Sequence, residues 1–310
     1  MLIPLRFVFA DGNVFDASTD IVNGQTPIQG IINSPIFQNY DFNNSHAIYY
    51  HGEVAPLIRV GNNQYGDAFQ RANFWDSVST RAPNYHVLLG QPTVLPTQTI
   101  NVPYGSFSYY VDPSSGETLP RVDQAILQNL VVPVLTAAHV VATDLPIIVW
   151  GKVSGSAPQY WRGVHGVRSI NGDALQTFIG TAYLPGDFAQ DVYPLSHEIV
   201  EWIDDPFVNN YTPGWDIPFV TRVRCDSGFV SDLLEAADPA EVYIPDSDVA
   251  LPGGAYTYHV TEALFIDFYT RSNRSRSYNG QYSFFEIGSP YGLLAEPSAP
   301  CTGHVQFTPT

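Results

Sequence analysis

The sequence is poor in positive charge. Of its 310 residues, 13 are Lys or Arg and 30 are Asp or Glu, and Lys152 is the single lysine. The formal net charge of −17 argues against binding to nucleic acid or to an anionic membrane surface, because both repel an acidic protein. We therefore expect no nucleic-acid partner.

Long apolar runs are also missing. No run reaches the roughly 18 apolar residues that a membrane-spanning helix needs, so we expect no membrane span. The opening MLIPLRFVFADG has too short an apolar run for a secretory signal. Because few charges and one lysine are typical of extracellular proteins, we expect a secreted or periplasmic protein whose signal peptide has been removed or replaced by Met1.

Cysteine is scarce, since Cys225 and Cys301 are the only two and are too few for a disulfide framework. A bond between them would close a loop of about 75 residues and contribute about 4 kcal/mol by restricting the unfolded chain. Two unpaired thiols are the alternative, and the sequence leaves both open.

Hydrophobic residues make up 45% of the chain and aromatic residues 14%, which predicts a folded protein with a large core. The spacing of apolar residues predicts a short strand, three helices, a region of extended chain and further strand-like runs. These lie at 5–10 (strand), within 25–42, 65–79 and 121–135 (helices, the last ending near Pro133), at 85–111 (extended), and at 145–155, 162–170, 175–184, 258–272 and 282–289 (strands).

Together these elements predict an α+β fold, zincin-like, in which a mostly antiparallel sheet backs a helix at 191–204 and the C-terminal part is β-rich. We expect residues 1–205 to form an N-terminal lobe that ends in this helix. Residues 206–310 would form a C-terminal lobe that completes a cleft, and the two lobes would make one compact unit.

The candidate site is SHEIVEWIDD at 196–205, a helical segment that Pro206 ends. His197 and Glu201 are four residues apart, so both side chains project from one helix face and can bind one metal ion. In the related His-Glu-x-x-His motif the glutamate is the general base, and Glu198 occupies that position. An acidic surface helix with one ordinary histidine is the alternative.

The carboxylate of Glu201 in place of a second histidine makes the site more tolerant of hard cations. Zinc is the first expectation, and calcium or another divalent cation is the alternative. A catalytic site needs a third protein ligand, which we assign to Glu235 in a second acidic helix, whereas Asp238 reads as the end of that helix. His165 lies in a strand just before the motif helix and could line the cleft, but a structural role is the usual one for such a histidine.

Asp204 and Asp205 lie at the helix C-terminus, where the dipole disfavours carboxylates. They predict a neutralising partner, either a cation or an arginine. Asp205 is too far along the helix to share an ion with His197, and we expect it to order the following loop or to bind a second cation.

The order GVHGV, TFIGTAYL, His-Glu-x-x-Glu-x-x-x-Asp-Pro, NNYTPGW and Glu-x-x-Asp-Pro resembles secreted proteins that include plant phosphate-induced, Exordium-like proteins and bacterial extracellular relatives. The match covers about residues 145–245. The resemblance implies a zincin-like metal site at His197 and Glu201, with Glu198 as base, in an exported protein.

The sequence thus predicts a secreted zinc-dependent metallopeptidase or related hydrolase acting on a peptide or protein substrate. The acidic surface would favour neutral or basic substrates. A non-catalytic extracellular protein that binds carbohydrate or a cell-wall partner through Trp161, Tyr211 and Trp215, with structural metal, is the alternative. A glycoside hydrolase would need two carboxylates about 5–10 Å apart across a groove, and no such pair stands out.

Overall fold

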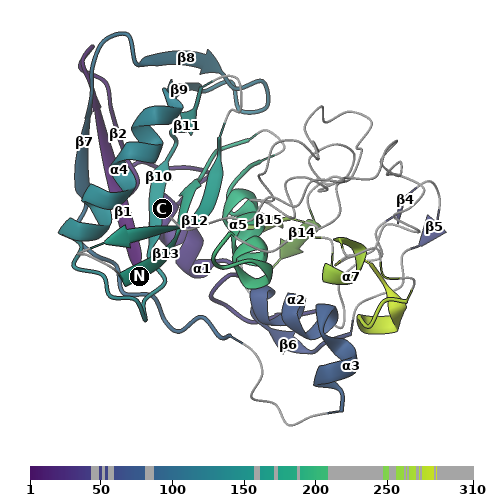
Figure 1. Ribbon diagram of the computed structural model, residues 1–310. Helices are drawn as coiled ribbons and strands as arrows, with labels where there is room; N and C mark the ends of the chain where they lie inside the picture. The colour runs from purple at the N-terminus through teal and green to yellow at the C-terminus, as the bar shows by residue number, and fades with distance from the viewer. Residues whose placement is uncertain are drawn as a thin grey trace, which may run out of the picture.

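A computed structural model describes most of the first two thirds of the chain and part of the remainder (Figure 1). Side chains and backbone are described for residues 1–42, 59–80, 87–156, 161–170, 175–186, 189–208, 256–261, 263, 265–267, 272, 274–282 and 284. The backbone alone is described for residues 49–50, 53–54, 174, 247–250 and 268–269. Glu235, Asp238, Cys225, Cys301, Tyr211 and Trp215 lie outside these ranges, so the predictions about them stay predictions.

The main sheet has six strands in the order β12-β13-β10-β1-β2, with β7 also pairing with β1 (Figure 1). The central strand β1 pairs with β10 through Leu2–Pro4, with β2 through Arg6–Val8 and with β7 through Leu5–Phe9. The six strands are β1 (Leu2–Phe9), β2 (Val14–Asp16), β7 (Gln98–Val102), β10 (Ile147–Gly151), β12 (Gly163–Ile170) and β13 (Ala174–Ala182).

The prediction of a mostly antiparallel sheet was wrong for the main sheet. Its described β1–β7, β1–β10 and β10–β13 pairings are parallel, whereas β12 pairs antiparallel with β13 at one edge and β2 antiparallel with β1. Parallel neighbours need long crossover connections, and α4 (Gln124–Ala137) lies in the segment between β7 and β10. The continuous apolar run of β10 was the overlooked signal, because inner parallel strands are buried on both faces.

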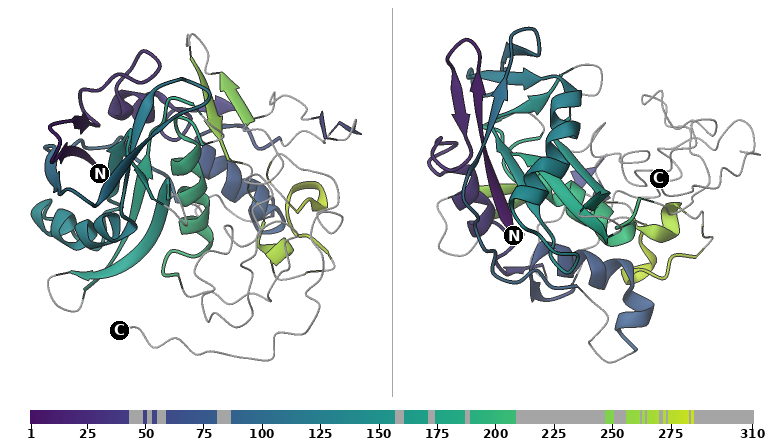
Figure 2. Two further views of the ribbon diagram at one scale, coloured as in Figure 1. Left: turned by 90° about the horizontal axis from the view of Figure 1, so that it is seen from above. Right: turned by 60° about the vertical axis from the view of Figure 1, so that its left-hand side comes forward.

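Both faces of the sheet are covered by apolar side chains. Ile147 and Val149 of β10 belong to one core cluster, while Ile148 and Trp150 belong to the other, as the alternation of a strand requires. The first cluster includes residues of α1 (Pro27–Asn33), α2 (Tyr65–Asn73) and α5 (Tyr193–Asp204), and the second includes α4. Figure 2 shows α4 and α5 on opposite sides of the sheet. The molecule is thus a mixed α/β structure consistent with the predicted α+β class.

Three helix predictions need correction, two of them at the C-terminal end and one within the helix. α1 ends at Asn33, because Ser34 precedes a proline. The helix expected over 65–79 is broken at Phe74 into α2 and α3 (Trp75–Val78). α4 continues past Pro133 to Ala137, since Val134 and Leu135 pack into the core and compensate for the hydrogen bond that proline cannot make.

The prediction of a strand over 258–272 is confirmed only at its start. β15 (Thr257–Val260) pairs with β14 (Ser247–Ala250), but Ile266–Tyr269 form the short helix α7. In this helix Asp267 accepts hydrogen bonds from the backbone N–H and the guanidinium group of Arg276. The remaining elements are β3 (Tyr40–Asp41), β4 (Tyr49–Tyr50), β5 (Glu53–Val54), β6 (Asn62–Asn63), β8 (Phe107–Val111), β9 (Thr118–Val122), β11 (Ser154–Gly155) and the 3-10 helix η1 (Tyr278–Gly280).

Described residues from the C-terminal part, among them Tyr258, Val260, Phe265 and Phe284, share the first core cluster with α2 and α5. The proposed lobe boundary after residue 205 stays a prediction.

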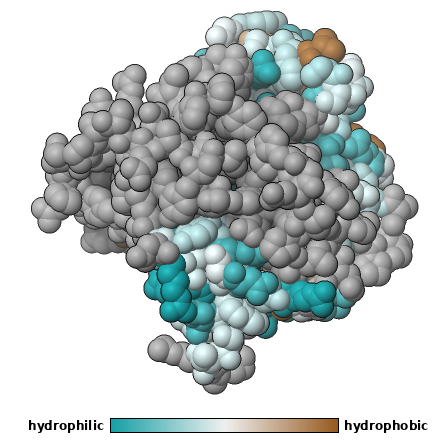
Figure 3. Space-filling view, turned by 90° about the vertical axis from the view of Figure 1, so that its right-hand side faces the viewer, coloured by the Kyte–Doolittle hydropathy of each residue, from teal (hydrophilic) through white to brown (hydrophobic). Residues whose placement is uncertain are grey.

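None of the described helices has the length and apolar character needed to cross a membrane. On the face in Figure 3 most of the described side chains are hydrophilic, with small apolar spots near the top.

Candidate metal centre

The motif helix α5 is buried along most of its length. One side of the helix contacts β12 and β13 of the main sheet, and the other side contacts β15 (Figure 1). Pro194 occupies the first turn, where its missing N–H costs nothing. Leu195 and Ile199 anchor the helix in the core, and the same helix buries His197, Glu198 and Glu201. The alternative of a solvated acidic helix is therefore excluded.

Two carboxylates of α5 converge on one imidazole of the edge strand. His165 Nδ1 on β12 lies 3.0 Å from Glu201 Oε2 and 3.4 Å from Glu198 Oε2. One ligand atom from each of these three residues lies within 4.8 Å of the other two. In the described part of the chain this is the one group of three such residues that could hold a metal ion.

Glu201 also contacts the first histidine of the motif. His197 Nε2 lies 3.0 Å from Glu201 Oε1, across one turn of α5. Each oxygen of Glu201 therefore faces a different imidazole, His197 on one side and His165 on the other. All three residues and Glu198 are at most 6% exposed.

The backbone of β12 comes close to the helix at Gly163. A Cβ atom added there would lie 2.7 Å from Glu198 Cγ and would overlap the carboxylate as well. Glycine at this position therefore lets the strand approach α5 closely enough for His165 to reach both glutamates.

The surroundings shift the pKa values of Glu198 and Glu201 in opposite directions. Burial, reinforced by the charge of Glu201, raises the pKa of Glu198 to about 8. Burial also opposes ionisation of Glu201, but the imidazoles of His197 and His165 outweigh it and hold the pKa of Glu201 well below its usual range. At neutral pH the pair without a metal ion thus carries one negative charge and one proton on Glu198.

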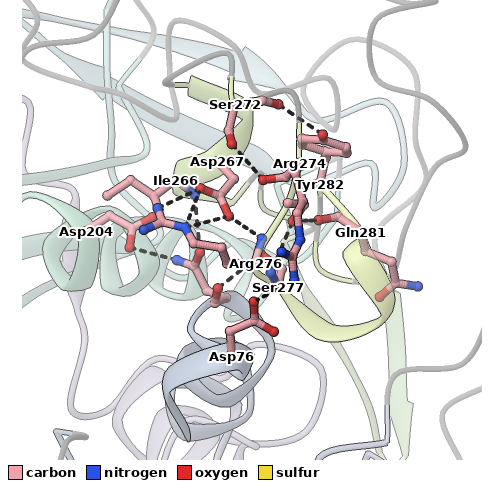
Figure 4. A network of polar contacts seen from close by, with 12 residues as sticks. Asp76, Asp204, Ile266, Asp267, Ser272, Arg274, Arg276, Ser277, Gln281 and Tyr282 are labelled. Atoms are coloured by element: carbon pink, nitrogen blue, oxygen red, sulfur yellow. Dashed lines mark hydrogen bonds and ion pairs between the residues drawn. The ribbon is translucent and has the colours of Figure 1, made fainter. Parts of the chain in front are cut away.

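The C-terminal end of α5 has its own polar network. Asn73 Nδ2 donates to Asp204 Oδ1 at 3.0 Å, Asn73 Oδ1 accepts from the Ile266 N–H at 3.2 Å, and the Asn73 carbonyl accepts from Ser277 Oγ at 3.0 Å. Figure 4 shows this network continuing to the Asp267–Arg276 pair. Burial raises the pKa of Asp204 well above its usual range, and the charges of Asp205 and Glu201 add to that effect, whereas the Asn73 hydrogen bond opposes it.

This network surrounds Asp204, one of the two acids at the C-terminal end of α5. Asp204 turns inward and is bonded by an amide, and burial favours its protonated form, so a proton can supply the neutralisation that the sequence left to a cation or an arginine. The backbone carbonyl of Asp205 accepts from the Val208 N–H at 3.1 Å, at the start of the following loop.

The structure thus brings together three of the four predicted residues, His197, Glu198 and Glu201, and the fourth, Glu235, lies outside the described ranges. It adds His165, which the sequence placed either in the lining of the cleft or, as is usual for such a histidine, in a structural role. The sequence feature that could have indicated this role for His165 is the pair of glycines around it, Gly163 and Gly166, in the strand before the motif helix.

Comparison with known proteins gave no match: no family model fits the sequence, and no curated protein or solved structure is significantly similar to it. The resemblance to Exordium-like proteins and the zincin-like fold therefore stay predictions.

Proposed function

We propose that the protein is a divalent-metal-dependent hydrolase, with a peptide or protein as its substrate. One observation carries the proposal: two buried carboxylates of one helix meet the imidazole of His165 on the adjacent edge strand. Burying two carboxylates is costly unless protons or a cation neutralise them. A divalent cation would neutralise both, and one imidazole with two carboxylates is a donor set that suits zinc or manganese.

Two ligand sets share Glu201. The described residues favour His165, Glu198 and Glu201, in which Glu198 gives up its proton to the solvent when the ion binds. The set predicted from the sequence is His197, Glu201 and Glu235, with Glu198 left free as the general base. In the first set His197 orients Glu201 through the 3.0 Å contact, and in the second His165 does so.

When bound, the ion would acidify a water molecule and polarise the substrate carbonyl. The protein residues hold the ion, keep Glu201 ionised and provide a carboxyl group, Glu198, that exchanges protons near neutral pH. Zinc is the first candidate and calcium or manganese the alternative. The low lysine content and the small share of charged residues support the further proposal that the protein works outside the cytoplasm.

The decisive measurement is elemental analysis of protein purified without added metal, combined with zinc titration by calorimetry. We expect about one ion per chain in the wild type and loss of the ion in Glu201→Gln. His139→Asn, which changes an exposed histidine away from the site, is the matched control and should retain the metal. A wild type that neither carries nor takes up a divalent ion would refute the proposal.

Glu198→Gln separates the two ligand sets. If Glu198 is a ligand, this variant and His165→Ala lose the ion, and His197→Ala weakens binding by about 10- to 100-fold, as an orienting residue would. If Glu198 is the base, Glu198→Gln retains the ion but loses hydrolysis of a fluorescent peptide library, and His197→Ala loses the ion.

The low exposure of the site residues favours an alternative function: a non-catalytic binding protein in which the metal ion links α5 to β12. Metal binding that raises the melting temperature, with no hydrolysis of peptide libraries by protein loaded with zinc, manganese or calcium, would establish this alternative.

A further inference from the structure

A surface pocket of about 530 Å³ lies where the short helix α3 meets the segment around η1. This volume is within the roughly 300–1,000 Å³ that small-molecule sites usually have. None of the residues of the metal centre lines the pocket, so it is a separate feature of the molecule. Its lining residues are Trp75, Asp76, Arg274, Ser275, Ser277, Asn279, Gly280 and Tyr282.

The described lining of the pocket is aromatic and polar. Trp75 and Tyr282 supply two rings, and the other side chains supply a carboxylate, a guanidinium, an amide and two hydroxyls. No aliphatic side chain is among these lining residues. A ligand with a large apolar surface would take the polar groups out of water without giving them partners, which is costly. The lining therefore suits a ligand that carries many hydrogen-bonding groups of its own.

The charges at the pocket are balanced. Arg274 Nη2 lies 3.4 Å from Asp76 Oδ2, and Figure 4 shows this contact beside the Asp267–Arg276 pair. Arg276 Nη2 lies 2.7 Å from Asp267 Oδ1, so the second arginine also has its own carboxylate. A phosphate would find no unmatched arginine here, and a hard cation, which takes six or more oxygen ligands, would find one lining carboxylate. The lining thus favours a neutral ligand.

The walls of the pocket are fixed by hydrogen bonds to the rest of the fold. Ser277 Oγ donates to the Asn73 carbonyl at 3.0 Å, which ties the η1 segment to α2. The Asp76 N–H donates to the Arg276 carbonyl at 2.9 Å, which ties α3 to the same segment. Because the two walls are held in place before a ligand arrives, binding requires little further ordering of the protein.

Four side chains remain available to a ligand. The ring of Trp75 contacts Tyr278 edge to face, with centroids 4.8 Å apart, and is still partly exposed. The side chains of Asp76 and Arg274 are 47% and 81% exposed. Asn279 is exposed and has a positive φ of 54°, and within the described part of the chain its amide makes no hydrogen bond.

We propose that this pocket binds a neutral saccharide. The C–H groups on one face of a sugar ring carry a small positive charge and stack on the negative face of an aromatic ring, here that of Trp75. The amide of Asn279 can both donate to and accept from neighbouring sugar hydroxyls. The 3.4 Å contact between Arg274 and Asp76 is longer than the roughly 2.7–2.9 Å of a strong charged hydrogen bond, so hydroxyls can bind between the two groups. This inference does not depend on the metal centre.

The first test follows the indole N–H signal of Trp75 by proton–nitrogen NMR of the full chain, assigned with Trp75→Phe. The probes are cellotriose, maltotriose, mannotriose and tri-N-acetylchitotriose, with inorganic phosphate and trialanine as competing ligand classes. At least one neutral saccharide should shift the Trp75 signal saturably and leave the signal of the buried Trp150 in place. No shift with any of the four, or a shift with phosphate or trialanine alone, would overturn the inference.

The second test removes the polar groups without disturbing the fold. Asn279→Gly deletes the amide at a position whose positive φ glycine adopts readily, and Arg274→Ala deletes an exposed guanidinium. Each should weaken binding of the saccharide at least 10-fold with an unchanged melting temperature. Arg6→Ala is the matched control, because Arg6 is also exposed and lies 3.9 Å from a carboxylate, that of Asp16. Binding that is the same in all three variants and the wild type would overturn the proposal.

The third test concerns charge. The wild type should prefer the neutral trisaccharide to trigalacturonate, which carries carboxylates. Asp76→Asn leaves Arg274 without its matching charge, so this variant should bind trigalacturonate at least 3-fold more tightly than the wild type does. A wild type that prefers trigalacturonate, or a variant with unchanged affinity for it, would show that charge balance does not select the ligand and would overturn the assignment to a neutral saccharide.

Discussion

Gly163 of β12 packs directly against the side chain of Glu198 on α5, at a distance that leaves no room for a Cβ atom. Gly163→Ala should therefore push Glu198 and the strand apart and destabilise the protein by about 1–3 kcal/mol, the usual cost of overpacking. Urea unfolding followed by circular dichroism measures this. Gly90→Ala is the control, because a Cβ atom at the exposed Gly90 meets nothing within 4 Å. Equal stability of both variants would contradict the close contact.

Zinc should stabilise the protein through the site. At 100 times the dissociation constant, an ion that binds only the folded chain adds about 2.7 kcal/mol, and the thermal midpoint should rise accordingly. The rise should be absent in Glu201→Gln and present in His139→Asn. Because binding displaces a proton in the ligand set that includes Glu198, affinity should increase as pH rises toward about 8. A rise in the midpoint that persists in Glu201→Gln would place the ion elsewhere.

Without metal, stability should fall as pH rises across the neutral range. The pKa of Glu198 is about 8 in the folded protein against 4.5 for the unperturbed group, so between these values the folded chain keeps a proton that the unfolded chain has lost. The free energy of unfolding then decreases by up to about 1.4 kcal/mol per pH unit from this group. Asp204 contributes with the same sign.

Glu198→Gln tests whether Glu198 causes this pH dependence of stability, because glutamine cannot ionise. Chemical unfolding in EDTA at pH 5 to 8 should give a shallower decline for this variant than for the wild type. Parallel curves would mean that Glu198 is ionised in the folded protein without metal, contrary to the raised pKa.

Asn73 should be a sensitive position, because its side chain joins α2, α5 and the N-terminus of α7. Asn73→Ala leaves Asp204 and the Ile266 N–H without that amide, and each lost buried partner costs about 1–3 kcal/mol. We expect a loss of a few kcal/mol in urea unfolding, against less than about 0.5 kcal/mol for the exposed Asn101→Ala. Similar losses in the two variants would show that the network contributes little.

The sequence by itself predicted the motif helix and its C-terminal end, because apolar residues at helical spacing and Pro206 are local signals. The helix begins at Tyr193, two residues after the predicted start. It placed His197, Glu198 and Glu201 on one helix for the same reason, but it left open whether that helix is buried or lies on the surface, because burial depends on the strands that cover it. It also predicted the strands at 145–155, 162–170 and 175–184, where β10, β12 and β13 lie.

Only the tertiary structure decided which residues meet across long distances in the chain. His165 reaches Glu201 because β12 lies at the sheet edge beside α5, and His259 reaches Asp191 because β15 packs on the other side of the same helix. Parallel pairing of β1, β7, β10 and β13 and the continuation of α4 through Pro133 depend likewise on packing. Periodicity reports which face of an element is apolar, but the partner that covers that face is chosen by contacts between distant segments.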